Sequence, residues 1–277
     1  MQFTKWHGLG NDFIIINEGA APGADYHKLA LATCDRNFGI GADGLVVLGP
    51  SDLADFKMRI FNSDGSEADM CGNATRCVAR YLYETGLTAK TVFTLDTLAG
   101  IITPELFFED GRVRIVKVNM GEPRLTRENI PMTGNAGEQA VNMPLVAEGQ
   151  TYQFTAVSMG NPHCVIFVND VDNINLAAIG PKIETNEMFP KKTNVEFIQI
   201  VDRHTLKMRV WERGAGITKA CGTGACAALV AAVLNGHTER EATVRLDGGD
   251  LFITWADDNH IYKSGPAVEV FRGEFLL

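Results

Sequence analysis

The 277-residue sequence lacks long apolar runs, blocks of basic residues and cysteine pairs of the C-x-x-C type. Its longest apolar stretch, Ala225–Leu234, is far shorter than the roughly 20 residues that a membrane-spanning helix needs. Lysine and arginine are dispersed and the net charge is −9, which argues against binding to nucleic acid or to an anionic membrane surface. A small anionic substrate stays open, because it needs only a local positive potential.

Two further absences concern targeting and disulfides. The first residues, MQFTKWHGLGNDF, contain no basic stretch followed by an apolar one, so we expect no secretory signal. The six cysteines are not spaced as zinc ligands, and a chain of this length does not depend on a disulfide framework. We therefore expect reduced thiols, no bound metal and a cytoplasmic location. The apolar fraction of 45% is that of a globular enzyme with one large or two small domains.

What the sequence does contain is a repeat at an offset of 150 residues. Residues 58–86 read MRIFNSDGSEADMCGNATRCVARYLYETG and residues 208–236 read MRVWERGAGITKACGTGACAALVAAVLNG. Gly10-Asn11 and Gly160-Asn161 match at the same offset, as do the runs that begin at Gly44 and Asn194. Three segments in one order indicate two homologous halves. We place them at 1–119 and 120–265, with a final strand from 266–277 returning to the first half.

Both halves alternate strand-like and helix-like segments. Apolar residues alternate with charged ones around Val113 and Met208, as in half-buried strands. We expect strands at 12–17, 44–49, 56–62, 91–96 and 112–119, then at 152–157, 163–169, 194–201, 206–212, 242–247 and 250–256. Helices are expected near 25–36, 73–85 and 223–235. This pattern predicts an α+β fold of two pseudo-symmetric domains, each a curved, mostly antiparallel sheet wrapped on a central helix.

The two repeated helices differ in character. In 73–85 a stripe that includes Cys77 and Leu82 opposes a polar face of Arg76, Arg80 and Glu84, so we expect an amphipathic helix. The helix at 223–235 is apolar throughout Ala225–Leu234 and should be enclosed by its own domain.

The starts of these helices carry the chemistry. The repeat aligns Cys71 with Cys221, Gly72 with Gly222 and Asn73 with Thr223. Asn and Thr are N-cap residues, and the free amides and positive dipole end of a first turn favour an anion such as a carboxylate. The same environment favours thiolate, so we expect both sulfurs to be more acidic than a free cysteine. One thiolate and one thiol on opposite sides of an α-carbon could invert it by two-base proton transfer. The alternative, two small buried cysteines, is weaker for a pair at matching repeat positions.

Other polar residues are weaker candidates. Asn11 and Asn161 each follow a glycine at a strand start, and Asn62, Glu212 and Arg213 stand at strand ends, where loops carry function. His163 is either a core histidine or a site residue. The stretch GIGADG, residues 39–44, matches a dinucleotide fingerprint only formally, because it lacks the strand before it and the helix after it.

With these motifs the chain resembles the diaminopimelate epimerases over nearly its whole length. The matching segments are FTKWHGLGNDF, CDRNFGIGADG, RIFNSDGSEADMCGN, NMGEP at 119–123, SMGNPHC at 158–164 and ERGAGITKACGTGACAA at 212–228. The resemblance implies an isomerase of lysine and peptidoglycan precursor biosynthesis, active as a homodimer with its site between two domains. It also implies interconversion of LL- and meso-diaminopimelate by two cysteines without pyridoxal phosphate or another cofactor.

The resemblance assigns roles residue by residue. Cys71 and Cys221 are the acid/base pair, and His163 and Glu212 tune the thiols. The reacting carboxylate is held by Gly72, Asn73, Gly222 and Thr223. The distal end of the substrate is recognised by Asn11, Asn62, Asn161, Asn194, Glu212 and Arg213. One position departs from the pattern: some family members have a binding-site glutamine where this chain has Gly44.

Three alternatives remain at this stage. Another cofactor-independent racemase, for proline, hydroxyproline or histidine, shares the cysteine pattern, but proline has no distal carboxylate to engage the polar set. Phenazine-biosynthesis isomerases share the architecture and lack the cysteine pair. A thiol redox switch would use the two cysteines as a regulatory disulfide.

Overall fold

The computed structural model describes residues 1–276, which form two compact units. Unit 1 comprises Met1–Asn119 and Ser264–Leu277, and unit 2 comprises Met120–Lys263. The first boundary lies where the repeat places it. The second lies between residues 263 and 264, two residues before the expected 265/266.

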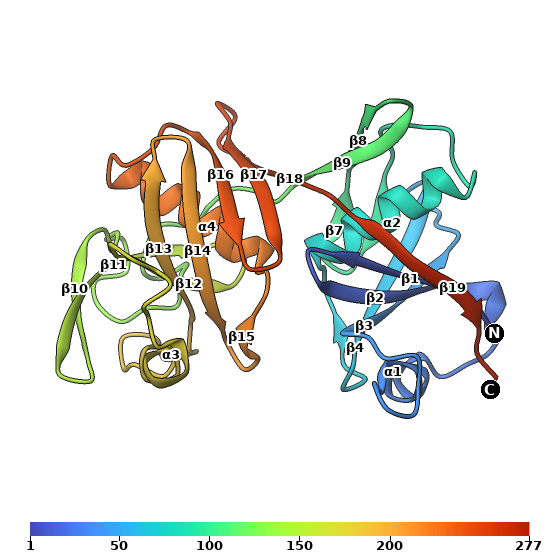
Figure 1. The fold of residues 1–277 in the computed structure, drawn as a ribbon, viewed down its shortest axis with the longest axis horizontal. Helices are drawn as coiled ribbons and strands as arrows, with labels where there is room; N and C mark the ends of the chain where they lie inside the picture. The colour runs from blue at the N-terminus through green and yellow to red at the C-terminus, as the bar shows by residue number, and fades with distance from the viewer. Residues whose placement is uncertain (277) are drawn as a thin grey trace. The chain divides into compact units, whose positions relative to one another are not determined.

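Unit 1 is a twisted sheet with strand order β19-β1-β2-β3-β4-β6-β7, in which β5 pairs with β4, together with the hairpin β8-β9. Its strands are β1 (Gln2–Gly8), β2 (Asn11–Asn17), β3 (Gly44–Gly49), β4 (Phe56–Asn62), β5 (Glu67–Ala68), β6 (Leu95–Thr97), β7 (Gly100–Ile102), β8 (Pro104–Glu109), β9 (Arg112–Asn119) and β19 (Val268–Glu274). Its helices are η1 (Glu18–Ala20), α1 (Tyr26–Cys34) and α2 (Gly72–Glu84). In Figure 1 the red strand β19 runs beside the dark blue β1, so the end of the chain completes the sheet that its beginning started.

Unit 2 has strand order β10-β11-β12-β13-β14-β16-β17, with β15 paired to β14. Its strands are β10 (Met143–Ala147), β11 (Gln150–Ser158), β12 (Pro162–Phe167), β13 (Asn194–Asp202), β14 (Thr205–Glu212), β15 (Gly216–Thr218), β16 (Glu241–Leu246) and β17 (Gly249–Trp255). Its helices are α3 (Leu176–Glu184) and α4 (Gly222–Leu234), and β18 (Ile261–Gly265) carries the chain across the second boundary.

The two sheets have the same pairing pattern. β2 and β3 are parallel, as are β12 and β13, and β4 with β6 matches β14 with β16. The remaining neighbours in both orders are antiparallel, and β19 takes in unit 1 the place that β10 takes in unit 2. The α+β prediction of two duplicated domains with mostly antiparallel sheets is therefore confirmed.

Each unit packs its sheet against one long helix. α4 contacts β11 through β14 as well as β16 and β17, and it is buried from Gly224 to Ala232, as its apolar sequence predicts. α2 contacts β1, β2, β8, β9 and β19. The expected polar face of α2 is wrong at Arg76, which is fully buried and donates from Nε to Pro266 O and from Nη1 to Asn73 Oδ1. The guanidinium tolerates burial because a backbone oxygen and a side-chain oxygen accept its hydrogen bonds.

Several elements differ from the sequence prediction. The strand expected at 91–96 is shortened to β6, with a single bridge at Val92, and β1, β8, β10 and α3 were not anticipated. α3 corresponds to α1 at the repeat offset, so the repeat contained the signal for it.

Turn geometry positions two of the expected site residues. Leu9 and Gly10 both have positive φ, 60° and 85°, and form the two-residue turn between β1 and β2. Gly160, at φ 97°, precedes Asn161 in the turn from β11 to β12. Each turn thus places an asparagine at the start of the strand that follows it, β2 for Asn11 and β12 for Asn161.

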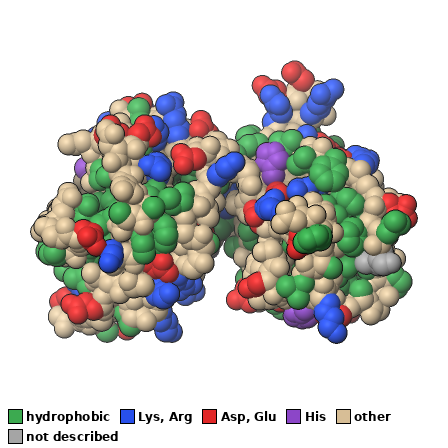
Figure 2. All heavy atoms as spheres, turned by 60° about the horizontal axis from the view of Figure 1, so that its bottom comes forward, with side chains coloured by type: hydrophobic (Ala, Val, Ile, Leu, Met, Phe, Trp, Pro, Cys, Tyr) green, Lys and Arg blue, Asp and Glu red, His purple; other side chains and the backbone are tan. Residues whose placement is uncertain are grey.

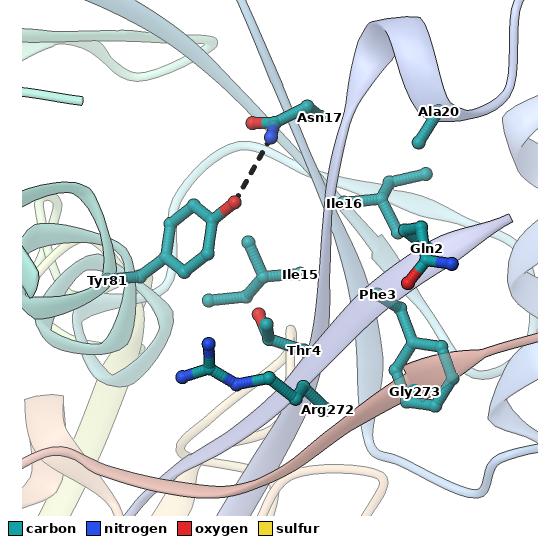
Figure 3. A pocket seen from close by; sticks show the side chains of 10 residues that line it. All are labelled: Gln2, Phe3, Thr4, Ile15, Ile16, Asn17, Ala20, Tyr81, Arg272 and Gly273. Carbon is teal, nitrogen blue, oxygen red and sulfur yellow. Dashed lines mark hydrogen bonds between the residues drawn. The ribbon is translucent and has the colours of Figure 1, made fainter. Parts of the chain in front are cut away.

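The surface shows no concentration of one charge on the face in Figure 2, where acidic and basic side chains are interspersed. No helix in residues 1–276 has both the length and the apolar character needed to cross a bilayer. A hollow of about 250 Å³ in unit 1 lies between β1, β2 and β19 (Figure 3), where Tyr81 accepts a hydrogen bond from Asn17. None of the predicted site residues lines this hollow.

Candidate active site

The two repeated cysteines occupy equivalent helix positions. Cys71 and Cys221 are the N-cap residues of α2 and α4, both extended, at φ −138° and −116°, and each helix has 13 residues. The expected caps Asn73 and Thr223 are wrong, because each is the second residue inside its helix. Their side chains bind tertiary partners, Asn11 for Asn73 and Asn161 for Thr223, in addition to neighbours on their own helices.

In unit 1 these residues form the Cys71 cluster, which we define as Cys71, Asn11 and Asn73. The Cys71 thiol lies 3.8 Å from Asn11 Oδ1, and Asn73 Nδ2 donates to the same oxygen at 3.1 Å. Asn11 Nδ2 donates to Asp43 Oδ2 at 2.7 Å. Asp43, which the sequence did not indicate, therefore fixes the amide so that its oxygen faces the thiol.

Asp43 is in turn part of a charged network behind the cluster. Arg36 donates to Asp43 and, in a bidentate pair, to Asp12. Lys5 also pairs with Asp12 at 2.9 Å. Burial by itself would raise the pKa of Asp12, but the hydrogen bonds from Arg36 and Lys5 prevail and lower that pKa to about 2. This network holds β2 against the segment that carries Asp43.

The corresponding Cys221 cluster of unit 2 comprises Cys221, Thr223, Asn161, His163 and Glu196. Cys221 Sγ accepts from the Gly224 amide at 3.4 Å and lies 3.6 Å from Thr223 Oγ1. Asn161 Nδ2 donates to Thr223 Oγ1 at 3.3 Å, and Asn161 Oδ1 lies 3.0 Å from His163 Nε2. His163 Nδ1 lies 2.6 Å from Glu196 Oε1, with both side chains fully buried.

The pKa of the Cys221 thiol is raised well above its usual range, so the prediction of an acidic sulfur is wrong for Cys221. Burial is the main cause, and the carboxylate of Glu212 raises the pKa further. The hydrogen bonds from Thr223 and Gly224 act in the opposite direction and do not prevail. Burial and this charge therefore favour the thiol form of Cys221 over the thiolate.

The other predicted residues lie at strand ends. Glu212 ends β14 and accepts a hydrogen bond from Thr218 Oγ1, and Asn62 ends β4 with its amide bound to Ser66. Arg213 is exposed. Asn194 is buried, and its amide spans two loops by donating to Pro162 O and accepting from Arg213 N.

Position 44 has no room for a larger side chain in this backbone. A Cβ on Gly44 would lie 2.9 Å from Phe61 O. Gly44 aligns with Asn194 at the repeat offset. Unit 1 therefore has no side chain at the position where unit 2 has an amide.

Comparison with known proteins decides the family. The family model described as diaminopimelate epimerase matches residues 3–126 and 155–270. The chain belongs to the diaminopimelate epimerase family. A diaminopimelate epimerase of Pelotomaculum thermopropionicum is 59% identical over 278 residues, which cover 99% of each chain.

Solved structures of two other kinds have the same fold as this diaminopimelate epimerase family member. A phenazine biosynthesis protein of the PhzF family from Bacillus anthracis has a TM-score of 0.72 at 18% identity, covering 100% of this chain and 99% of its own. A probable proline racemase from Agrobacterium radiobacter has a TM-score of 0.71 at 14% identity, covering 100% and 93%. At these identities the likeness concerns the fold alone.

Two features of the clusters escaped the sequence analysis. Glu196 stands in the apolar run NVEFI of β13, and an acid there signals burial with a partner. Its counterpart at the repeat offset is Val46, so a comparison of the halves would have singled it out. Asp43 likewise aligns with a residue of another kind, Thr193.

Proposed function

We propose that the protein interconverts LL- and meso-diaminopimelate by transferring the α-proton between the thiols of Cys71 and Cys221. The observation that carries the proposal is the placement of both cysteines as N-caps of matching 13-residue helices, in a chain of the diaminopimelate epimerase family. A cysteine with only a packing role has no reason to recur at the same cap in both units.

The reaction requires the two sulfurs to reach opposite faces of one α-carbon. A thiolate takes the α-proton, so that an S–H bond forms as the C–H bond breaks, and the opposite thiol gives its proton to the carbanion. Charge that spreads into the substrate carboxylate is stabilised by the first-turn amides of α2 and α4. By reversibility, the cysteine that acts as the acid in one direction of the reaction is the base in the other.

The binding roles are assigned on the family resemblance. Gly72, Asn73, Gly222 and Thr223 lie in the first turns, where a carboxylate meets backbone amides. Asn194 uses both of its polar groups within unit 2, and we assign it the role of holding the backbone at Arg213. The exposed Arg213 and the residues Asn11, Asn62, Asn161 and Glu212 are assigned to the rest of the substrate.

The test is incubation with LL-diaminopimelate in deuterated water without added cofactor. Deuterium should enter one α-position together with formation of the meso isomer. Cys221→Ala and Cys71→Ala should each abolish epimerisation in a folded protein. Cys226→Ala is the matched control, because this buried cysteine of α4 lies one turn beyond the cap, and it should retain activity.

Other outcomes would identify other functions. Exchange of proline or histidine without exchange of diaminopimelate would assign the protein to another racemase type. Retained turnover in Cys221→Ala would contradict the two-base scheme. A redox switch predicts a reversible disulfide with no exchange of any amino acid.

We also propose a cytoplasmic homodimer, as the resemblance implies. Light scattering of the purified protein should give twice the chain mass of 30.2 kDa. Cell fractionation tests the location.

A further inference from the structure

His163 and Glu196 form a buried polar pair that the fold itself does not require. Both side chains are 0% exposed, and their Nδ1 and Oε1 atoms are 2.6 Å apart. At the repeat offset their places in unit 1 are taken by Phe13 and Val46, which are buried in an equivalent sheet. Burying such a pair is ordinarily less favourable than burying apolar residues of similar size. The pair therefore has a role that Phe13 and Val46 do not need to fulfil.

The sheet directs this pair towards the reactive helix. β12 and β13 are parallel, with His163 opposite Asn194 and Val165 opposite Glu196. The alternate residues Cys164, Val195 and Phe197 belong to the apolar cluster on the other face, together with residues of α3. His163 and Glu196 thus lie on the face that contacts α4.

The first turn of α4 is shaped to the carboxyl group. A Cβ at Gly224 would lie 2.8 Å from Glu196 Oε1, whereas the corresponding residue of α2 is Ala74. The glycine leaves the space that Glu196 fills. Glu196, His163, Asn161, Thr223 and Cys221 then follow one another in contact, ending at the sulfur.

The hydrogen bonds of His163 require one proton between its Nδ1 and Glu196 Oε1. Asn161 donates its amide to Thr223, so its oxygen faces His163 and accepts from Nε2–H. The lone pair of Nδ1 in a neutral imidazole then faces Glu196 at a distance that needs one proton. Full burial disfavours an ion pair relative to a neutral one.

Burial and the nearby Glu212 also favour the protonated form of Glu196. Burial raises the pKa of Glu196, and the nearby Glu212 carboxylate raises it further, although His163 lowers it. The thiols of Cys221 and Cys164 also adjoin Glu196, and burial raises the pKa of both. Within residues 1–276, Glu196 Oε2 has no hydrogen-bond partner, as suits a carboxyl group that donates through its other oxygen.

We propose that Glu196 is a positioning residue that donates a proton to Nδ1 of neutral His163 and so fixes the Nε2–H tautomer that orients Asn161 beside Thr223 and Cys221. The expected change in KM rests on the proposed function, whereas the expected tautomer of His163 rests on geometry. Asn161 contacts substrate in the proposed function, so a loss of its orientation weakens substrate binding more than proton transfer.

The first test is nitrogen NMR of His163 in protein with labelled histidine, near neutral pH and without substrate. The expected spectrum has a protonated Nε2 and an unprotonated Nδ1. A doubly protonated imidazole, or a proton on Nδ1, would overturn the proposal. This readout needs no turnover, so its outcome stands whether or not diaminopimelate is the substrate.

The second test compares two substitutions at the same position. Glu196→Gln can still donate an N–H to Nδ1, so it should keep the tautomer and a KM close to that of the natural protein. Glu196→Leu cannot donate, and it should give a tautomer mixture with a KM about tenfold higher and a smaller change in kcat. Ile198→Ala, two residues along the same face of β13, is the packing control and should change stability while leaving the tautomer and KM unaltered. Equal KM values for the Gln and Leu variants would overturn the positioning role. If the Leu variant does not fold, the Gln variant is compared with the natural protein, and a changed His163 tautomer in the Gln variant would overturn the proposal.

Discussion

Replacement of Gly224 by alanine tests how tightly the first turn of α4 packs against Glu196. A Cβ at this position would lie 2.8 Å from Glu196 Oε1 and 3.2 Å from Cys221 Sγ. The helix position itself accepts alanine, because α2 has the buried Ala74 there, three residues after Cys71. The contact with the carboxyl group is therefore what distinguishes the two units.

The magnitude follows from opposing contributions. Alanine is about 1 kcal/mol more favourable than glycine within a helix. Displacement of the carboxyl group breaks its contact with His163 and leaves a buried polar group unpaired, at a cost of about 1–3 kcal/mol. An extra methyl group in a packed interior costs about 1–3 kcal/mol more. We expect Gly224→Ala to lower the free energy of unfolding of unit 2 by about 3 kcal/mol.

Urea unfolding followed by tryptophan fluorescence measures this change, since Trp211 and Trp255 belong to unit 2 and Trp6 to unit 1. The same substitution in a Glu196→Val background should be neutral or stabilising, because valine is the residue that accompanies Ala74 in unit 1. The double-mutant cycle should then give a coupling of about 3–4 kcal/mol. An equal cost in both backgrounds, or no cost in the natural one, would refute the packing argument.

Three further predictions follow from the site and its supports. Burial and the Glu212 carboxylate raise the pKa of Cys221, so its alkylation should be slow at neutral pH and faster as the pH rises. Glu212→Gln should speed alkylation at pH values near 8. An unchanged rate, measured by peptide mass spectrometry, would contradict this. The Asp12 pKa falls from 3.8 to about 2 on folding, which corresponds to about 2 kcal/mol of stability that is present above the unfolded pKa and lost as pH falls through the folded one. Asp12→Asn should therefore lower neutral-pH stability by about this amount and flatten the acid limb of a stability–pH curve. Arg76→Met removes the hydrogen bond to the segment before β19, so hydrogen exchange of β19 should accelerate while that of β16 and β17 does not change.

The repeat made much of the fold predictable. It located both long helices within one residue, and the strands β2, β3, β12 and β13 within one or two residues, because these elements have strong periodicity and repeat at one offset. α3 escaped because its sequence, LAAIGPKIE, contains Gly180 and Pro181, which disfavour a helix interior. Tertiary packing outweighs that preference: a Cβ on Gly180 would lie 2.5 Å from Trp211 Cγ, so the glycine lets the helix lie against β14.

The electrostatics of the site was less predictable than its residues. A helix start is expected to lower the pKa of a thiol, and the Gly224 amide does contribute in that direction at Cys221. The larger effects come from burial and from Glu212, which approaches Cys221 from β14. Local sequence contains no information on such neighbours until the sheet order is known. The caps were misplaced for the same reason, since Asn73 and Thr223 are engaged by the distant residues Asn11 and Asn161.

The position of β19 has a consequence for the order in which the protein is made. Unit 2 is one continuous segment, Met120–Lys263, and has all its strands once that segment has left the ribosome. Unit 1 is begun first and finished last, because its sheet waits for Val268–Glu274 to cover the edge of β1. Until then the β1 edge exposes unpaired backbone groups that invite pairing with other chains. A premature stop or a bulky C-terminal fusion would thus impair the half of the protein that was synthesised earliest.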